Sequence, residues 1–270
     1  MSMIQIQKVS KFFPGGKSKN LLVLDQVSLD VPEGEFLVLI GPSGCGKSTL
    51  LRIMAGLAEP SLGKVTIAGR AVDGPAVGVG MVFQTYTSFP WLTVEQNVAF
   101  GLSLKGTDRI KNSEKVRKIV DRVGLSKFLA AFPSQLSGGM QQRVAIARAL
   151  ATDPKVLLMD EPFGALDAMI RVEMQAFLID LWQQERKTVV FVTHDIDEAI
   201  LLGDRIVVLS PHPGRIHEVL NVKIARPRSI QDTETSDFVA LRHALRTMIF
   251  AMGEANNALT RPEQVSDCLP

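Results

Sequence analysis

Apolar and amphipathic stretches alternate along this chain of 270 residues. The apolar runs are rich in Val, Ile and Leu, as are strands buried on both faces, and the stretches between them have the three- and four-residue spacing of helices that cover a sheet. The pattern therefore predicts an α/β fold with a mostly parallel sheet. The predicted strands are Ile4–Val9, Phe36–Ile40, Lys64–Ala68, Val79–Phe83, Val156–Met159, Val189–Val192 and Arg205–Leu209.

The segment Leu92–Leu150 has few strand signals, and charged amphipathic patches such as Ser113–Val123 indicate helices. We interpret this segment as a helical insertion between two parts of one α/β core. After Gly214 the pattern predicts a last strand, Arg215–Leu220, and then a break at Pro227.

An amphipathic helix is predicted beyond that break, with Thr235 or Ser236 as its N-cap, and the polar stretch from Gly253 to Pro270 is expected to be frayed. The apolar residues that define this helix are Phe238, Leu241, Leu245, Met248 and Met252.

Composition narrows the class of protein. Thirty Lys and Arg against 28 Asp and Glu give a formal net charge of +2, which argues against a protein that coats nucleic acid. No apolar run approaches the ~20 residues that span a bilayer, and the first residues lack the pattern of a signal peptide. The two cysteines, Cys45 and Cys268, are far apart, so no disulfide framework is expected. These features predict a soluble protein of a reducing compartment.

Residues 41–48 match the phosphate-loop pattern G-x-x-x-x-G-K-[ST], directly after the predicted strand Phe36–Ile40. Glycines let backbone N–H groups wrap a polyphosphate, and the following helix points its positive end at the charge. Lys47 can reach the β and γ phosphates, and the Ser48 hydroxyl can ligate Mg²⁺. The candidate nucleotide-binding residues here are Gly41, Pro42, Ser43, Gly44, Cys45, Gly46, Lys47, Ser48 and Thr49.

A pair of carboxylates follows the predicted strand Val156–Met159. Asp160, at the end of the strand, would hold Mg²⁺ through water, and Glu161 would polarise the attacking water as general base. The alternative to a catalytic pair is a buried strand that ends in a capping acid. The phosphate loop in the same chain makes this alternative less favourable.

The residues Leu136, Ser137, Gly138, Gly139 and Met140 precede a stretch with helical spacing. A hydroxyl and unpaired N–H groups at the start of a helix can form a second anion-binding site. The alternative is an ordinary Ser-Gly helix cap, which has the same sequence pattern. The string resembles the signature sequence of ATP-binding cassette (ABC) ATPases. This resemblance implies Mg-ATP hydrolysis in a head-to-tail dimer, with itself or a paralogue, in which ATP lies between the phosphate loop of one chain and the signature of the other.

The order of the other motifs fits the same family. Gln84 is similar to the Q-loop glutamine, which contacts Mg²⁺ and water, Asp167 to the D-loop aspartate, and His194 to the switch histidine, which contacts the γ-phosphate. Phe13 takes the place of the adenine-stacking aromatic residue, with Phe12 as the close alternative.

The resemblance also implies a fold. This is a P-loop NTPase (RecA-like) core with an antiparallel β subdomain and an inserted α-helical subdomain at about residues 87–151, forming an ABC ATPase domain over residues 1–220. Residues 221–270 would be a short helical extension and tail. The chain departs from the family at Met140, where Gln is most familiar, and at Gly164, where Ser is frequent. Neither change removes a group that contacts phosphate.

Three stretches look like the ATPases of nitrate, sulfonate and taurine importers: residues 89–98, 193–199 and 210–216. In cassette importers the first region receives a cytoplasmic helix of the membrane permease, so Pro90 and Trp91 are candidates for that contact, with packing inside the helical insertion as the alternative for Trp91. The implied partners are permease subunits and, indirectly, a periplasmic or lipid-anchored solute-binding protein, with no nucleic acid. The implied location is the cytoplasmic face of the inner membrane, as a peripheral subunit.

Other classes of protein fit less well. A soluble cassette ATPase that acts on DNA or ribosomes usually has a long coiled-coil insertion or two cassettes, and neither is visible in this sequence. A kinase or GTPase of another P-loop family would not explain Ser137 and His194 together.

Overall fold

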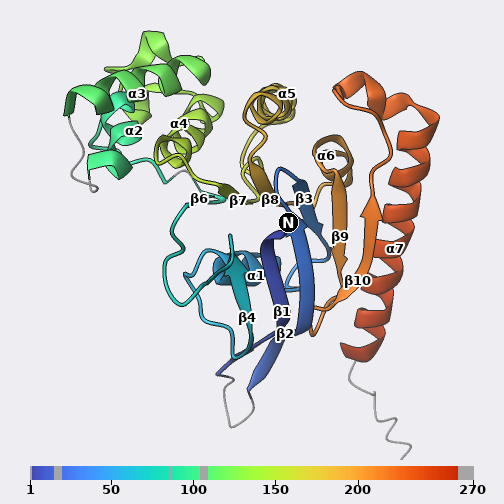
Figure 1. The fold of residues 1–270 in the computed structure, drawn as a ribbon. Helices are drawn as coiled ribbons and strands as arrows, with labels where there is room; N and C mark the ends of the chain where they lie inside the picture. The colour runs from blue at the N-terminus through green and yellow to red at the C-terminus, as the bar shows by residue number, and fades with distance from the viewer. Residues whose placement is uncertain (1, 15–19, 86, 104–108, 261–270) are drawn as a thin grey trace, which may run out of the picture.

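The computed structural model describes residues 2–14, 20–85, 87–103 and 109–260. Two sheets and seven α-helices make up this part of the chain (Figure 1). The larger sheet has the strand order β10-β9-β3-β8-β7-β6, in which only β10 is antiparallel to its neighbour. Its strands are β3 (Phe36–Ile40), β6 (Val79–Val82), β7 (Val156–Asp160), β8 (Thr188–Val192), β9 (Arg205–Leu209) and β10 (Ile216–Asn221).

The smaller sheet is antiparallel, with the order β2-β1-β4-β5. Its strands are β1 (Ser2–Phe13), β2 (Leu21–Pro32), β4 (Leu62–Ile67) and β5 (Arg70–Ala71). The pattern of the sequence did not predict β2. Residues 27–32 alternate buried and exposed positions and could have indicated a strand, whereas the bulge at Gln26, with a φ of 48°, shifts the register of the apolar run 21–24 before it.

Alternate residues of β3 face two different cores. Phe36, Val38 and Ile40 pack under the helices α4 (Gly138–Ala151), α5 (Ala168–Glu185) and α6 (Ile196–Leu202), whereas Leu37 and Leu39 pack with α1 (Lys47–Met54) and the antiparallel sheet. Figure 1 shows the corresponding layers, with α5 and α6 on one side of the larger sheet and α1 on the other. Because successive side chains of a strand point to opposite faces, a strand buried in this way is apolar throughout.

A helical lobe consists of α2 (Val94–Ser103), α3 (Arg109–Arg122) and α4, with a core of its own. This confirms a helical segment between β6 and β7. Short 3₁₀ turns at Ser126–Phe128 and Pro133–Gln135 connect α3 to α4. Within the described ranges, none of the helices combines the length and the apolar character that crossing a membrane requires.

The last helix, α7 (Ser236–Thr260), lies against α6 and follows a 3₁₀ turn at Ile230–Glu234 (Figure 1). Phe238, Leu245 and Met252 are buried in the same core as α5 and α6, as their spacing predicts. The helix starts at Ser236, and the carbonyl of the preceding Thr235 accepts from Val239 N–H. It continues through Gly253, so the expectation of a frayed chain from that residue is wrong up to Thr260. Residues 261–270 lie outside the described part.

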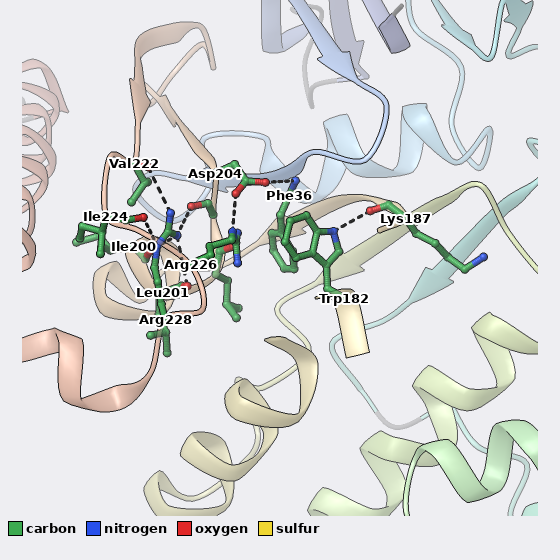
Figure 2. A network of polar contacts seen from close by, with 12 residues as sticks. Phe36, Trp182, Lys187, Ile200, Leu201, Asp204, Val222, Ile224, Arg226 and Arg228 are labelled. Carbon is green, nitrogen blue, oxygen red and sulfur yellow. Dashed lines mark hydrogen bonds and ion pairs between the residues drawn. The ribbon is translucent and has the colours of Figure 1, made fainter. Parts of the chain in front are cut away.

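Two arginines join the segment before α7 to the end of α6 (Figure 2). Arg228 is 4% exposed and donates to the carbonyls of Ile200 at 2.9 Å and Gly203 at 2.5 Å. Arg226 binds the Asp204 carboxylate at 2.7 Å, and its guanidinium lies 4.2 Å from the centre of the Trp182 ring. Burial lowers the pKa of Arg228 to about 10, so its cation persists at neutral pH and caps the negative end of α6.

Candidate functional site

The phosphate-loop residues connect β3 to α1, as the sequence predicts. Gly44 and Gly46 have φ values of 78° and 94°, a conformation that glycine adopts without strain. Lys47 begins α1 and is 6% exposed, and its ammonium group donates to the carbonyls of Gly41 at 2.8 Å and Pro42 at 3.0 Å. The loop therefore holds a buried cation beside the N-terminus of a helix. Thr49 follows Ser48 in the first turn of α1.

Cys45 is fully buried within this loop. Burial raises the pKa of its thiol, and this effect outweighs the opposing influence of the Lys47 ammonium group, 3.7 Å from the sulfur. The thiol is therefore an unreactive packing group.

A neighbouring loop supports the phosphate loop. Gly214, between β9 and β10, donates to Val23 carbonyl oxygen and accepts from Asp25 N–H, and a Cβ built on it would lie 2.0 Å from the Cys45 carbonyl oxygen. Only glycine allows the two backbones to come this close. The same approach puts the His212 ring beside Gly44, 3.5 Å from where a Cβ would be. His212 lies in the importer-like stretch 210–216, but its contact with Gly44 could not be predicted because a long-range contact leaves no local signal.

Asp160 ends β7 and accepts a hydrogen bond of 2.8 Å from the Ser48 hydroxyl. It is 4% exposed, and desolvation raises its pKa, against the effect of the Ser48 hydrogen bond and of the cations Arg52 and Lys47. The structure thus joins two of the three predicted metal ligands, Ser48 and Asp160, which are 112 residues apart in the chain.

Glu161 follows with a φ of 42°, a strained value for a side chain of this size. Its N–H donates to Val192 carbonyl oxygen at 3.0 Å, and its Oε2 lies 2.9 Å from His194 Nδ1. The His194 side chain is 63% exposed and that of Glu161 is 20% exposed. Gln84 is exposed two residues beyond β6, whose Val82 pairs with Met159.

Strand order explains why these residues meet. Strands β3, β8, β7 and β6 are parallel neighbours, so their carboxyl ends lie at one edge of the sheet. The phosphate loop, His194, the Asp160–Glu161 pair and Gln84 each follow one of these ends.

The signature residues lie elsewhere. Ser137 caps α4, and its hydroxyl accepts from Met140 N–H at 3.4 Å. A Cβ on Gly139 would lie 2.6 Å from Ile170 Cγ2 on α5, so close helix packing requires glycine there. Leu136 is buried, and Met140 packs against the core of the helical lobe. Helices α4 and α1 cover opposite faces of the larger sheet, so one chain separates its signature, including Gly138, from its phosphate loop.

Asp167 is the N-cap of α5, where its carboxylate accepts from Ile170 N–H at 3.0 Å. Sequence reasoning missed this structural role, although Asp before an apolar helix is a known start signal. A Cβ on Gly164 would make ordinary contact with Glu161, 3.4 to 3.9 Å away, so the site has room for the more frequent serine.

The two candidate adenine-stacking rings end β1 and are similarly accessible, Phe12 at 36% and Phe13 at 39% exposure. The Lys11 ammonium group lies 5.2 Å from the centre of the Phe13 ring. Both rings are therefore accessible to a nucleotide base.

Trp91 is 69% exposed on a fixed loop, next to the exposed Pro90. Asn97, fully buried on α2, fixes that loop by accepting from Phe89 N–H and donating to the carbonyls of Phe89, Leu92 and Thr93. The Trp91 ring contacts the Phe89 ring at a centroid distance of 5.5 Å. Such exposure does not fit a residue that serves internal packing.

Behind His194 lies a polar group that sequence reasoning missed. It comprises Thr193, Asp195 and Glu198 around the start of α6, with Gln175 and Arg171 from α5. The spacing of Asp195 and Glu198 fits the capping-box pattern and could have indicated the helix start. The burial of Glu198, however, depends on tertiary packing.

Residues 24–164 match the family model described as ABC transporter. The chain belongs to the ABC transporter family. Membership in this family of ATP-binding proteins confirms the P-loop NTPase fold and identifies the chain as an ATPase that binds ATP.

Relatives of this ABC ATPase agree over most of its length. It is 44% identical to the taurine import ATP-binding protein TauB of Pelagibacter ubique, over 94% of this chain and 97% of that protein. It is 50% identical to the aliphatic sulfonates import ATP-binding protein SsuB of Bacillus subtilis, over 82% of this chain and 84% of that protein. Its structure is similar to the dimeric cassette MJ0796 bound to ADP and Pi, with a TM-score of 0.72 and 33% identity over 83% of this chain and all of that one.

Proposed function

We propose that this ABC ATPase is the energy-coupling subunit of an importer for a small anion or organic solute such as taurine, an alkyl sulfonate or nitrate. The relatives named for taurine and sulfonate import support the transport role. The observation that carries the catalytic part is the pair of contacts at one sheet edge, Ser48 with Asp160 and Glu161 with His194. In this proposal residues 1–220 are the ATPase domain, with a helical subdomain at about 87–151, and 221–270 are an extension.

The ATP phosphates bind the N–H groups of residues 41–49 and the Lys47 ammonium group, while Phe13 stacks on adenine. The oxygens of Ser48 and Asp160 suit Mg²⁺, which prefers oxygen ligands and keeps several sites for water and phosphate. The buried Asp160 carboxylate, whose pKa desolvation raises, fits a position beside a cation. Gln84 is the third candidate ligand. When bound, Mg²⁺ neutralises charge that develops on the β and γ phosphates.

Glu161 takes a proton from the attacking water as general base. His194, hydrogen-bonded to Glu161 through Nδ1, contacts the γ-phosphate through its exposed side and orients it. The Glu161 carboxylate contacts His194 whereas the Asp160 carboxylate contacts Ser48, so the basic group and the metal-binding group have different partners.

A complete site needs a second copy, or a paralogue, arranged head to tail. The N-terminus of α4, with Ser137, Gly138 and Gly139 and flanked by Leu136 and Met140, then reaches the γ-phosphate bound by the other chain. Asp167, at the start of α5, meets the partner between the two sites. ATP binding thereby closes the dimer, and hydrolysis reopens it.

ATP is expected to convert Glu161→Gln from monomer to dimer, because the variant binds ATP and cannot release the closed state by hydrolysis. Sedimentation velocity with and without Mg-ATP measures this. The matched control adds Ser137→Arg, which fills the trans site with a cationic side chain and should keep the protein monomeric while ATP still binds. A dimer that forms equally well with Ser137→Arg would contradict the head-to-tail arrangement.

The permease contacts the ATPase at the exposed loop that contains Pro90 and Trp91. An aromatic side chain on a loop fixed by Asn97 suits a hot spot for a short helix, because little conformational entropy is lost on binding. The subunit then lies peripherally on the cytoplasmic face of the membrane. A solute-binding protein on the outer side of the membrane delivers the solute to the permease, and this chain does not contact the solute.

Trp91→Ala is expected to reduce co-purification with the permease at least tenfold and to leave ATP binding unchanged. Phe250→Ala on α7 is the control, since Phe250 is 62% exposed and distant in sequence from this loop. Undiminished permease assembly of Trp91→Ala would refute the contact. An absence of any membrane partner for the wild type would favour a soluble, non-transport ABC ATPase.

A further inference from the structure

Thr193, the residue between β8 and His194, is buried, and its hydroxyl accepts a hydrogen bond from the backbone beyond His194. The residue is 2% exposed. Its oxygen accepts from Asp195 N–H at 3.0 Å, and its hydroxyl favours the charged form of the nearby Glu198 carboxylate. The hydroxyl thus joins the backbone on the far side of His194 to a side chain of α6.

Glu198 is 3% exposed and is held from three directions. Gln175 of α5 donates to its Oε1 at 3.1 Å, its own N–H donates to Asp195 Oδ1 at 3.1 Å, and the Thr193 hydroxyl favours its charged form. Desolvation raises its pKa, and the hydrogen bonds from Thr193 and Gln175 oppose that shift. A buried carboxylate is costly unless hydrogen-bonded, so these contacts lock its position.

His194 itself is mostly exposed, and its ring contacts Glu161 across 2.9 Å. An exposed imidazole has few packing contacts to fix its position, so the backbone at residues 193 and 195 determines where it lies. Asp195 is fixed by the Thr193 hydroxyl, by Glu198 N–H and by Arg171, whose guanidinium lies 3.7 Å away.

We propose that Thr193 and Glu198 are positioning residues, which hold His194 in register with Glu161 through a buried hydrogen-bonded link to α5 and α6. This inference rests on the proposed roles of Glu161 and His194. A misplacement of about 1 Å in such a pair can cost about a hundredfold in rate, so a link of this kind affects turnover more than binding.

The same strand provides a matched control. Thr188, at the other end of β8, is 1% exposed, and its hydroxyl also accepts a backbone N–H, from Gly34 at 2.9 Å. Thr188→Val and Thr193→Val therefore remove the same group from equally buried sites on one strand. They differ in distance from His194.

The test compares kcat and KM for ATP in the full chain for Thr193→Val, Thr193→Ser and Thr188→Val. We expect Thr193→Val to lower kcat at least tenfold, with KM changed less than twofold, and Thr193→Ser to recover most of the loss because it restores the hydroxyl. The His194 ring resonance, assigned by its loss in His194→Gln, should shift in Thr193→Val and stay in place in Thr188→Val.

Two outcomes overturn the inference. Equal losses of kcat in Thr188→Val and Thr193→Val would assign Thr193 a general role in stability. An unshifted His194 resonance in Thr193→Val would show that the link does not determine the position of the His194 ring. A different result would contradict the proposed role of His194 itself. If His194→Gln hydrolyses ATP at the wild-type rate, His194 has no catalytic role, irrespective of the results for the Thr193 variants.

Discussion

Glu161→Gln is expected to lower ATP turnover by about 10²- to 10⁴-fold, the range that a general base contributes. The substitution keeps the size of the side chain and replaces the carboxylate that accepts a proton. Its amide can still pair with His194 Nδ1, so the local geometry at 2.9 Å should persist. ATP affinity should therefore change little.

Steady-state phosphate release and equilibrium ATP binding measure the two effects on one preparation. Glu218→Gln, on the exposed face of β10, is the control for loss of a carboxylate. Turnover within threefold of the wild type would show that another group activates the water.

Lys47→Ala is expected to weaken ATP binding by at least about 30-fold, since truncating one member of a buried charge pair costs about 2 kcal/mol or more. Lys47, at the start of α1, is 6% exposed, and the carbonyls of Gly41 and Pro42 hold its ammonium group in the loop. Little reorganisation is needed before it meets a phosphate.

Isothermal titration with ATP measures this loss, and Lys155→Ala is its control because that exposed lysine lies at the opposite, amino end of β7. Thermal unfolding of both variants separates lost affinity from lost folding. Wild-type affinity in a folded Lys47→Ala protein would contradict the assignment of the phosphate loop.

Most of the larger sheet follows from sequence because its strands are short, apolar and buried on both faces. The strand β2 has a regular alternation only in residues 27–32, since the bulge at Gln26 shifts the register of the apolar run before it. The end of α7 also differs from the predicted end at Gly253, because a glycine weakens a helix without ending it.

The site shows the same division between local and long-range information. Spacing in the sequence is sufficient to find Lys47, Asp160 and Glu161, because each belongs to a local pattern. The burial of Glu198 and the approach of His212 to Gly44 depend on how separate elements pack. No window of sequence contains both partners of the His212 contact, so pattern reasoning has nothing to detect.

The arginine contacts at the end of α6 restrict how related chains can diverge. Arg228 satisfies carbonyls of Ile200 and Gly203 that would otherwise be buried without a donor. A lineage that loses this arginine must supply another donor or shorten α6 at the same time. The tail of this chain and the helix after His194 should therefore co-evolve, although 25 residues separate Arg228 from Gly203.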